Sequence, residues 1–182
     1  EVQEIEAPCA EKFFSLSLKR YMGPYTVEFL NYPAEFNPED YNTTPYGPFE
    51  ADSIQYGNVD NSVPFGEYVI KVTDACGREK IESATIEFEK PTPLVYGRNN
   101  GCFSEYGRIR AEVPESMVVN ATIIDAPSTY TLSIPQNVTA NISSSGILLL
   151  YDIPIGDYTI EFTDDCGFNY VVNVEVPPFV EQ

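Results

Sequence analysis

The chain has 182 residues and a net charge of −18 at pH 7, from 28 Asp and Glu against 10 Lys and Arg. It contains no His, which excludes His-based catalytic triads, imidazole metal ligands and the usual general base near neutral pH. The negative charge argues against nucleic-acid and anionic-membrane surfaces, because binding to either needs Lys and Arg. With 43% hydrophobic and 13% aromatic residues, the chain can still form a folded core.

One segment of the sequence occurs twice. Residues 63–77 align with residues 153–167 at a constant offset, and the Pro, Gly, Tyr, Ile, Thr, Asp, Cys and Gly of this segment recur at matching positions. Further upstream, residues 26–31 resemble residues 120–125 more loosely. A chain of this length fits two domains of about 90 residues each. The sequence therefore predicts two tandem copies of one unit.

The Pro-rich ends of the copies set the expected boundaries. We expect one module over residues 8–91 and a second over 98–178, joined by a Pro-containing linker at 92–97. Residues 1–7 are interpreted as the linker from a preceding repeat, and 179–182 as the start of the next linker. The chain is thus expected to be a piece of a longer tandem array. No stretch is apolar over enough residues to span a membrane, so we expect no direct membrane insertion.

Apolar and polar residues alternate in several short stretches, and such alternation is typical of half-buried strands. In chain order these stretches are residues 14–18, 25–29, 68–72, 81–88, 109–113, 130–134, 158–162 and 168–176. Helical spacing is absent, and Pro and Gly recur too often for long helices. The sequence therefore predicts an all-β fold of two tandem immunoglobulin-like β-sandwich domains.

The alternation within the repeated strand assigns each of its side chains to the inner or the outer face of the sheet. Tyr68 and Tyr158 are expected on the inner face, where a tyrosine hydroxyl at the corner of an immunoglobulin-type domain caps backbone groups. The same parity puts Cys76 and Cys166 on the inner side at the strand end. Gly77 and Gly167 are expected to supply the positive φ of the hairpin that follows.

Each unit contains two of the four cysteines, which allow three disulfide connectivities. The simplest connectivity is Cys9–Cys76 and Cys102–Cys166, one intradomain disulfide per unit. The alternative is a buried pair of reduced cysteines in each unit. Two copies keep the same pair, which favours the disulfides. A cross-link that closes a loop of about 65 residues would stabilise a unit by about 4 kcal/mol.

Acidic residues are too evenly spread to single out a catalytic pair, so we expect no enzyme, no catalytic residues and no cofactor. Asp74, Asp164 and Asp165 near the repeated turn, and the Glu39-Asp40 pair, are oxygen donors of the kind that calcium prefers. No Asp-x-Asp-x-Asp-Gly loop is present, however. An Asp beside a hairpin more often accepts hydrogen bonds from backbone N–H groups, so no metal site is predicted.

The longest loop-like stretch is residues 31–58, which is rich in Pro, Asn and Thr. Loops on a rigid scaffold often bind ligands. Tyr41, Tyr46, Phe49 and Tyr56 therefore form a candidate surface for a polysaccharide or protein. The alternative is that these aromatic residues cover the edge of a small core.

The pattern of Gly-x-Tyr, alternating apolar residues and Thr-Asp-x-Cys-Gly resembles the SprB-type repeats of Bacteroidota cell-surface adhesins. Gly23-Pro24-Tyr25-Thr26 also matches a Gly-x-Pro-Tyr element of that family. The resemblance implies immunoglobulin-like modules in long arrays on secreted proteins, some tied to gliding motility. It implies a spacer that presents adhesive elements at the cell surface, with neighbouring repeats as partners. Asp52-Ser53-Ile54 resembles a Bacteroidota O-glycosylation site, which makes Ser53 a candidate for modification.

Overall fold

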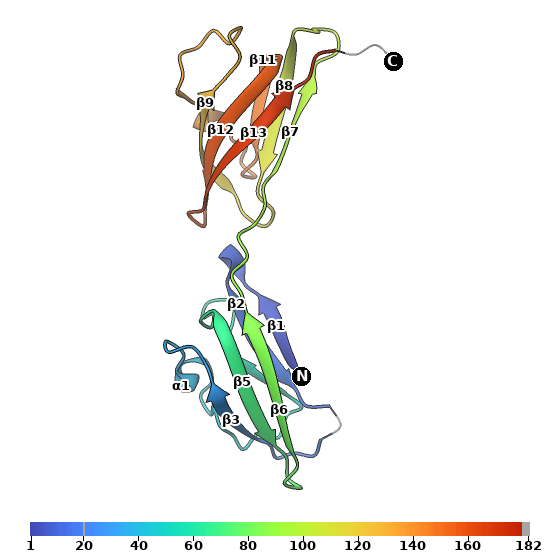
Figure 1. The fold of residues 1–182 in the computed structure, drawn as a ribbon, viewed down its shortest axis with the longest axis vertical. Coiled ribbons are helices and arrows are strands. Elements are labelled where there is room, and N and C mark those ends of the chain that lie inside the picture. The colour runs from blue at the N-terminus through green and yellow to red at the C-terminus, as the bar shows by residue number, and fades with distance from the viewer. Residues whose placement is uncertain (20, 180–182) are drawn as a thin grey trace. The chain divides into compact units, whose positions relative to one another are not determined.

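The computed structural model describes residues 1–19 and 21–179, and these residues divide into two compact units. The first unit ends at Glu89 and the second begins at Lys90. Each unit contains two antiparallel sheets (Figure 1). The all-β class predicted from the alternation of apolar and polar residues is therefore confirmed.

The first unit has two three-stranded sheets. One has the order β1 (Val2–Glu6), β2 (Lys12–Ser17) and β4 (Ser53–Tyr56); the other has β3 (Thr26–Asn31), β5 (Gly66–Thr73) and β6 (Glu79–Ile86). A short 3-10 turn, Pro8–Ala10, joins β1 to β2, and the one-turn helix α1 (Pro38–Tyr41) lies between β3 and β4.

The second unit repeats this topology. One sheet has the order β11 (Leu148–Pro154), β8 (Tyr106–Glu112) and β7 (Leu94–Asn99); the other has β10 (Gln136–Asn137), β9 (Val118–Asp125), β12 (Gly156–Asp164) and β13 (Asn169–Val176). A 3-10 turn at Thr139–Asn141 precedes β11. In both units the first, second and fourth long strands share one sheet, while the third, fifth and sixth share the other. This division matches the two sheets of immunoglobulin-like sandwiches.

The predicted boundaries between the units need correction. Residues 1–7, expected as a linker, contain β1, which pairs with β2 along its whole length. Residues 92–97, also expected as a linker, contain most of β7, which pairs with β8. Both segments are therefore the first strand of a sandwich. Of the predicted linker at 179–182, residues 180–182 lie outside the described part of the chain.

Most of the predicted strands are confirmed, but residues 130–134 form no strand. Alternating residues on the inner faces of the two sheets build a separate core in each unit. Tyr68 and Tyr158 are fully buried, and each hydroxyl donates to a carbonyl four residues upstream, Pro64 O at 2.6 Å and Pro154 O at 2.7 Å. This is the tyrosine corner expected from the sequence.

Two glycines let the sheets of the second unit approach closely at one edge. A Cβ at Gly97 would lie 2.1 Å from the Glu175 carbonyl oxygen of β13, and a Cβ at Gly107 would lie 2.3 Å from Val176 Cγ1 of the same strand. Both distances are far below van der Waals contact. These positions on β7 and β8 therefore need glycine so that β13 can pass over them.

The first and last strands of each unit show where the chain enters and leaves the sandwich. In the first unit, β1 begins beside the last residues of β2, because Val2 pairs with Leu16. The last strand, β6, finishes at Ile86 beside Gly66, where β5 begins. In the second unit, Leu94 pairs with Glu112 at the end of β8, and Val176 pairs with Gly156 at the start of β12. In each unit the chain therefore enters towards one end of the sandwich and leaves at the other.

Candidate functional site

The predicted intradomain disulfides are wrong. Cys76 and Cys102 are free and exposed, while Cys9 and Cys166 are disulfide-bonded. Neither the pair Cys9–Cys76 nor the pair Cys102–Cys166 is formed. The prediction that Cys76 points inward is also wrong, because the strand ends at Thr73 and Cys76 lies in the exposed turn after it.

The topology of the first unit explains why its two cysteines do not pair. Cys9 lies in the turn that precedes β2, whereas the turn that holds Cys76 contacts the loop that follows β2, through a hydrogen bond from the Ala75 N–H to the Met22 carbonyl (3.0 Å). The two turns lie at opposite ends of the unit (Figure 1). A strand of six residues such as β2 spans about 20 Å. A disulfide requires Cα atoms within about 7 Å of each other.

The second unit separates its two cysteines in the same way. Cys102 lies between β7 and β8, before β8 begins. The turn that holds Cys166 contacts the segment after β8, through a hydrogen bond from the Asp165 N–H to the Met117 carbonyl (2.8 Å). The seven residues of β8 span about 23 Å. Each unit therefore has one cysteine-bearing turn at each end.

The turns that hold Cys76 and Cys166 share one hydrogen-bonding pattern. Asp74 is buried, and its Oδ1 accepts the backbone N–H groups of Cys76 and Arg78, both at 2.9 Å. Asp164 Oδ1 accepts the N–H groups of Cys166 (3.1 Å) and Phe168 (2.8 Å) in the same way. The predicted role of these aspartates as acceptors of backbone N–H groups is thus confirmed.

The glycine that follows each of these cysteines also fits the sequence analysis. Gly77 has a φ of 74° and Gly167 a φ of 82°, in the left-handed region that glycine adopts readily. Together, the buried aspartate and the glycine fix the shape of the turn. The turn therefore presents its cysteine in the same local conformation in both units.

Three ionisable groups beside these turns have pKa values that differ from their usual ones. Burial raises the pKa of Asp74, but hydrogen bonds from the Arg78 backbone, the Arg78 side chain and the Cys76 N–H outweigh burial and leave the pKa below its usual value. Hydrogen bonds from the Ser116 hydroxyl and the Met117 N–H lower the pKa of Asp165. Burial and the Asp164 carboxylate raise the pKa of Tyr170 to about 12.

The aromatic residues of 31–58 mostly belong to the core of the first unit. Tyr56 is fully buried and donates its hydroxyl to the Pro45 carbonyl, so its assignment to a ligand surface is wrong. Tyr41 is half-buried and stacks on Phe36, with ring centroids 5.0 Å apart. Phe49 is half-buried and packs against the same core. Only Tyr46 among the four is exposed, so most of this candidate surface covers the core.

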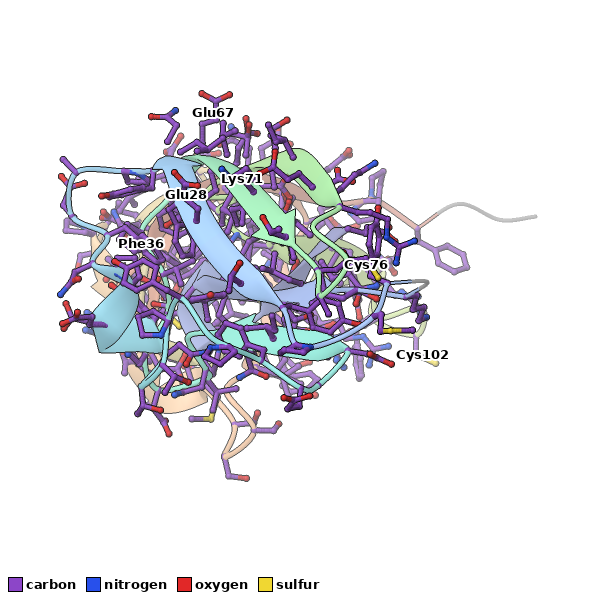
Figure 2. All side chains as sticks on the ribbon, turned by 90° about the horizontal axis from the view of Figure 1, so that it is seen from below. Glu28, Phe36, Glu67, Lys71, Cys76 and Cys102 are labelled. Carbon is purple, nitrogen blue, oxygen red and sulfur yellow. The ribbon has the colours of Figure 1, made fainter. Side chains whose placement is uncertain are left out.

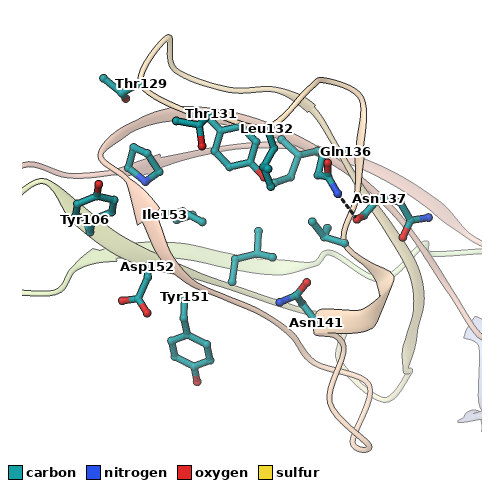
Figure 3. Close-up of a pocket in the computed structure, with 15 residues that line it drawn as sticks. Tyr106, Thr129, Thr131, Leu132, Gln136, Asn137, Asn141, Tyr151, Asp152 and Ile153 are labelled. Atoms are coloured by element: carbon teal, nitrogen blue, oxygen red, sulfur yellow. Dashed lines mark hydrogen bonds between the residues drawn. The ribbon is translucent and has the colours of Figure 1, made fainter.

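The second unit instead has a pocket of about 320 Å³ that sequence reasoning missed (Figure 3). The loop after β9 forms one wall through Thr129–Leu132, and β11 forms the other through residues 150–154. Figure 3 shows Thr131, Gln136 and Asn141 around this space, together with Tyr151 and Asp152 from β11. The pocket is lined mainly by aromatic and uncharged polar side chains, which are groups that hydrogen-bond to and stack on polar ligands.

A comparison of the two units explains the pocket. Phe36 in the first unit and Tyr130 in the second are equivalent, because each N–H bonds to the carbonyl three residues upstream, at Pro33 (2.9 Å) and Pro127 (2.8 Å). In the first unit α1 follows and Tyr41 covers the Phe36 ring. In the second unit the residues after Tyr130 form an irregular loop with Leu132 exposed. The apparent alternation over 130–134 hid this loop, although Pro127 and Pro135 flank it.

Ser53 is the first residue of β4 and is exposed. The preceding Asp52 accepts a hydrogen bond at 3.1 Å from the hydroxyl of Tyr25, a buried residue, which holds the start of β4 in place. The Ser53 hydroxyl is therefore accessible on a fixed strand. O-glycosylation at this residue stays a prediction.

The described residues contain neither a cluster of metal ligands nor a helix that could span a membrane. Over residues 1–19 and 21–179, no group of three or more acidic or cysteine side chains could hold a metal ion. In the same part of the chain, no helix has the length and apolar character needed to cross a membrane.

Lys71 lies between Glu28 (2.5 Å) and Glu79 (3.8 Å) on the outer face of the β3–β5–β6 sheet (Figure 2). Such exposed ion pairs contribute little to stability.

The chain is distantly similar to some solved structures. No family model and no curated protein matches the chain. The crystal structure of murine CEACAM1b is similar at 13% identity and a TM-score of 0.31, over 98% of this chain and 99% of that chain. BcpA, the major pilin subunit of Bacillus cereus, is similar at 11% identity and a TM-score of 0.22, over 97% of this chain and 66% of that chain. At such values the likenesses carry no argument about function, and the fold assignment depends on the strand order above.

Proposed function

We propose that this chain is a spacer segment of an extracellular cell-surface filament and holds an adhesive element away from the cell. The observation that carries the proposal is the direction of each unit: the chain enters towards one end of the sandwich and leaves at the other, in both copies. Units built in this way add length when they are joined in series. The proposal includes no catalytic role.

The first and last strands are suited to bear tension. Pulling on the ends of the first unit would load β1 against β2 and β6 against β5, with the force along the strands. Five residue pairs join β1 to β2, and eight join β5 to β6. A force along the strands loads the hydrogen bonds of a ladder together, whereas a force across them would break the bonds in sequence. In the second unit, six pairs join β7 to β8 and eight join β12 to β13.

The charge fits a filament that stays soluble. Residues 1–92 have 17 acidic and 7 basic residues, for a charge of −10, and residues 93–182 have 11 acidic and 3 basic residues, for −8. Both halves are therefore acidic. In a repeated array this charge would keep filaments apart through repulsion. The resemblance to SprB-type repeats, with its Bacteroidota and gliding-motility setting, belongs to this proposal and depends on the repeated motif alone.

The spacer proposal is tested with genes that encode one, two and three copies of the 182-residue chain in series. The longest strand, β12, has nine residues and spans about 30 Å, so each added copy of two units should lengthen the particle by about 60 Å. Small-angle X-ray scattering measures the maximum dimension. A steady increase per copy supports the proposal. A compact particle, whose maximum dimension grows only as the cube root of its mass, would contradict it.

A second candidate function is the binding of a polar ligand, and the pocket in the second unit favours it. Its lining of Tyr106, Thr131, Gln136 and Asn141, together with the carboxylate of Asp152, suits a neutral saccharide or a polar peptide better than an anionic ligand. A glycan array probed with the whole chain tests this function. Binding that Asn141→Ala abolishes and that the Tyr46→Ala control in the first unit leaves intact would establish it. Binding that Tyr46→Ala abolishes instead would return the site to residues 31–58.

A further inference from the structure

The two free cysteines lie in turns of different kinds. Cys76 lies in the β5–β6 turn, which is the equivalent of the β12–β13 turn that holds Cys166. Cys102 lies in the β7–β8 turn, which is the equivalent of the β1–β2 turn that holds Cys9. The chain therefore has one free cysteine of each kind. Its two disulfide-bonded cysteines are also one of each kind.

Neither free cysteine can pair within its own unit. The cysteine-bearing turns of a unit are separated by the length of β2 or β8, about 20 Å or more. That distance exceeds the separation of about 7 Å between Cα atoms that a disulfide tolerates. The separation recurs in both copies, so it is a property of the unit and not of one loop.

Both turns are built to hold a thiol at the surface. Asp74 accepts two backbone N–H groups of the Cys76 turn, and its carboxylate also binds the Arg78 side chain. In the other turn, the Gly101 N–H donates to Asn99 Oδ1 (2.8 Å) and the Cys102 N–H donates to the Asn100 carbonyl (2.9 Å). Both cysteine side chains, labelled in Figure 2, are exposed. The thiols are therefore presented to solvent by turns whose backbones are fixed.

We propose that Cys76 and Cys102 are a head-to-tail cross-linking pair, in which the Cys102 thiol of one copy of this chain forms a disulfide with the Cys76 thiol of another copy. The disulfide-bonded state of Cys166 and Cys9 is the second observation, because it shows that turns of both kinds accommodate a disulfide. Free cysteines of opposite kinds, at opposite ends of their units, would link copies in series.

The chemistry needs an oxidant, which we identify as a small-molecule or protein disulfide. The Cys76 thiolate attacks one sulfur of that disulfide and releases the other sulfur as a thiolate. The Cys102 thiolate of the second copy then attacks the Cys76 sulfur and displaces the remaining thiolate of the oxidant. Two protons and two electrons leave the two cysteines, and the oxidant is reduced to two thiols.

The test uses the whole chain, with Cys9 and Cys166 unchanged, in a buffer of oxidised and reduced glutathione. The variants Cys76→Ser and Cys102→Ser each retain one free cysteine. In the wild-type chain we expect a ladder of covalent oligomers on non-reducing gels. Each variant alone should stop at the dimer, because it has one reactive thiol. Circular dichroism checks that both variants fold, as exposed serines should allow.

An equal mixture of the two variants tests the specificity. Random pairing would give as much heterodimer as both homodimers together, whereas the proposal predicts that the heterodimer exceeds the two homodimers combined. Peptide mass mapping should find Cys76 joined to Cys102. A random mixture, a persistent monomer, or cross-links through Cys9 or Cys166 would each overturn the proposal. Cross-linking between copies is a property beyond the spacer role. The scattering experiment can fail while the cross-linking experiment succeeds, and the cross-linking experiment can fail while the scattering experiment succeeds.

Discussion

Removing the hydroxyl of the tyrosine corner should destabilise each unit by a similar amount. In the second unit the Tyr158 side chain is 1% exposed, and its hydroxyl donates to the Pro154 carbonyl at 2.7 Å. Tyr158→Phe keeps the ring and its edge-to-face contact with Tyr130, at 5.9 Å between centroids. The substitution therefore removes one hydrogen bond and little else. Tyr68→Phe does the same in the first unit, where the acceptor is Pro64 O at 2.6 Å.

The magnitude follows from the surroundings of the two carbonyl groups. A typical intramolecular hydrogen bond contributes about 1 kcal/mol, and an acceptor left unsatisfied in the interior costs about 1–3 kcal/mol. Pro64 and Pro154 are half-buried, so water can reach part of each residue. We therefore expect a loss of about 1 kcal/mol in the free energy of unfolding. For a unit of this size, that loss lowers Tm by about 4–8 °C.

Differential scanning calorimetry and urea unfolding measure the change. The matched control is Tyr151→Phe, because Tyr151 is 56% exposed and should lose almost no stability. Equal losses for Tyr158→Phe and Tyr68→Phe, with none for the control, would support the equivalence of the two units. An unchanged Tm for both corner variants, or an equal loss for Tyr151→Phe, would refute the reasoning.

Three further predictions concern packing, pH and the aromatic core. Gly97→Ala should destabilise the second unit by at least about 2 kcal/mol in urea unfolding, because the new methyl group meets the β13 backbone at 2.1 Å; a neutral result would refute the close approach. Asp74→Asn should lower Tm at pH 6, and the difference in Tm from wild type should shrink as pH falls below about 4. The reason is that the pKa of Asp74 is lower in the folded state than in the unfolded state, so protonation removes the stability that the carboxylate contributes. A difference in Tm that stays constant with pH would refute this reasoning. Tyr56→Ala should cost about 3–5 kcal/mol in the same unfolding assay, while Tyr46→Ala should cost under about 0.5 kcal/mol; equal costs would return Tyr56 to the surface.

The sequence was most informative where one face of a strand is buried. Alternation around Tyr68 and Tyr158 fixed the strand type, the inner face and the tyrosine corner, because a period of two leaves only two choices of face. The repeated Asp and Gly of the turn were also interpreted correctly. These features depend on local geometry, which a short segment of sequence specifies.

The cysteine pairing could not be predicted in this way. Parity assigns a residue to a face of the sheet, but a disulfide also depends on which end of the strand the residue occupies. With residues 1–7 interpreted as a linker, Cys9 had no strand before it and its end of the sandwich was undetermined. Because Val2–Glu6 form a strand, Cys9 lies in the turn before β2, far from Cys76. The partly polar sequence of this edge strand gave little sign of it.

The pocket was hidden for a related reason. Residues 130–134 alternate as a strand would, but Pro127 and Pro135 restrict the backbone on either side, and the described structure assigns no ladder to these residues. In the first unit, the residues that follow the equivalent Phe36 form α1. The ring of Tyr41, the last residue of α1, packs on Phe36 and fills the corresponding space. Whether a loop fills the space beside the core depends on packing between segments that are distant in the sequence. The alternation of apolar and polar residues along one segment carries no information about such packing.

Peptide mapping of the monomeric chain under non-reducing conditions tests the central claim most directly, namely that each unit has opposite ends with one cysteine-bearing turn at each. An alkylating agent of one mass is applied before reduction, and an agent of another mass after it. The account predicts that Cys76 and Cys102 react before reduction and that Cys9 and Cys166 react only after it. A peptide that joins Cys9 to Cys76, or Cys102 to Cys166, would place both turns at one end and contradict the account.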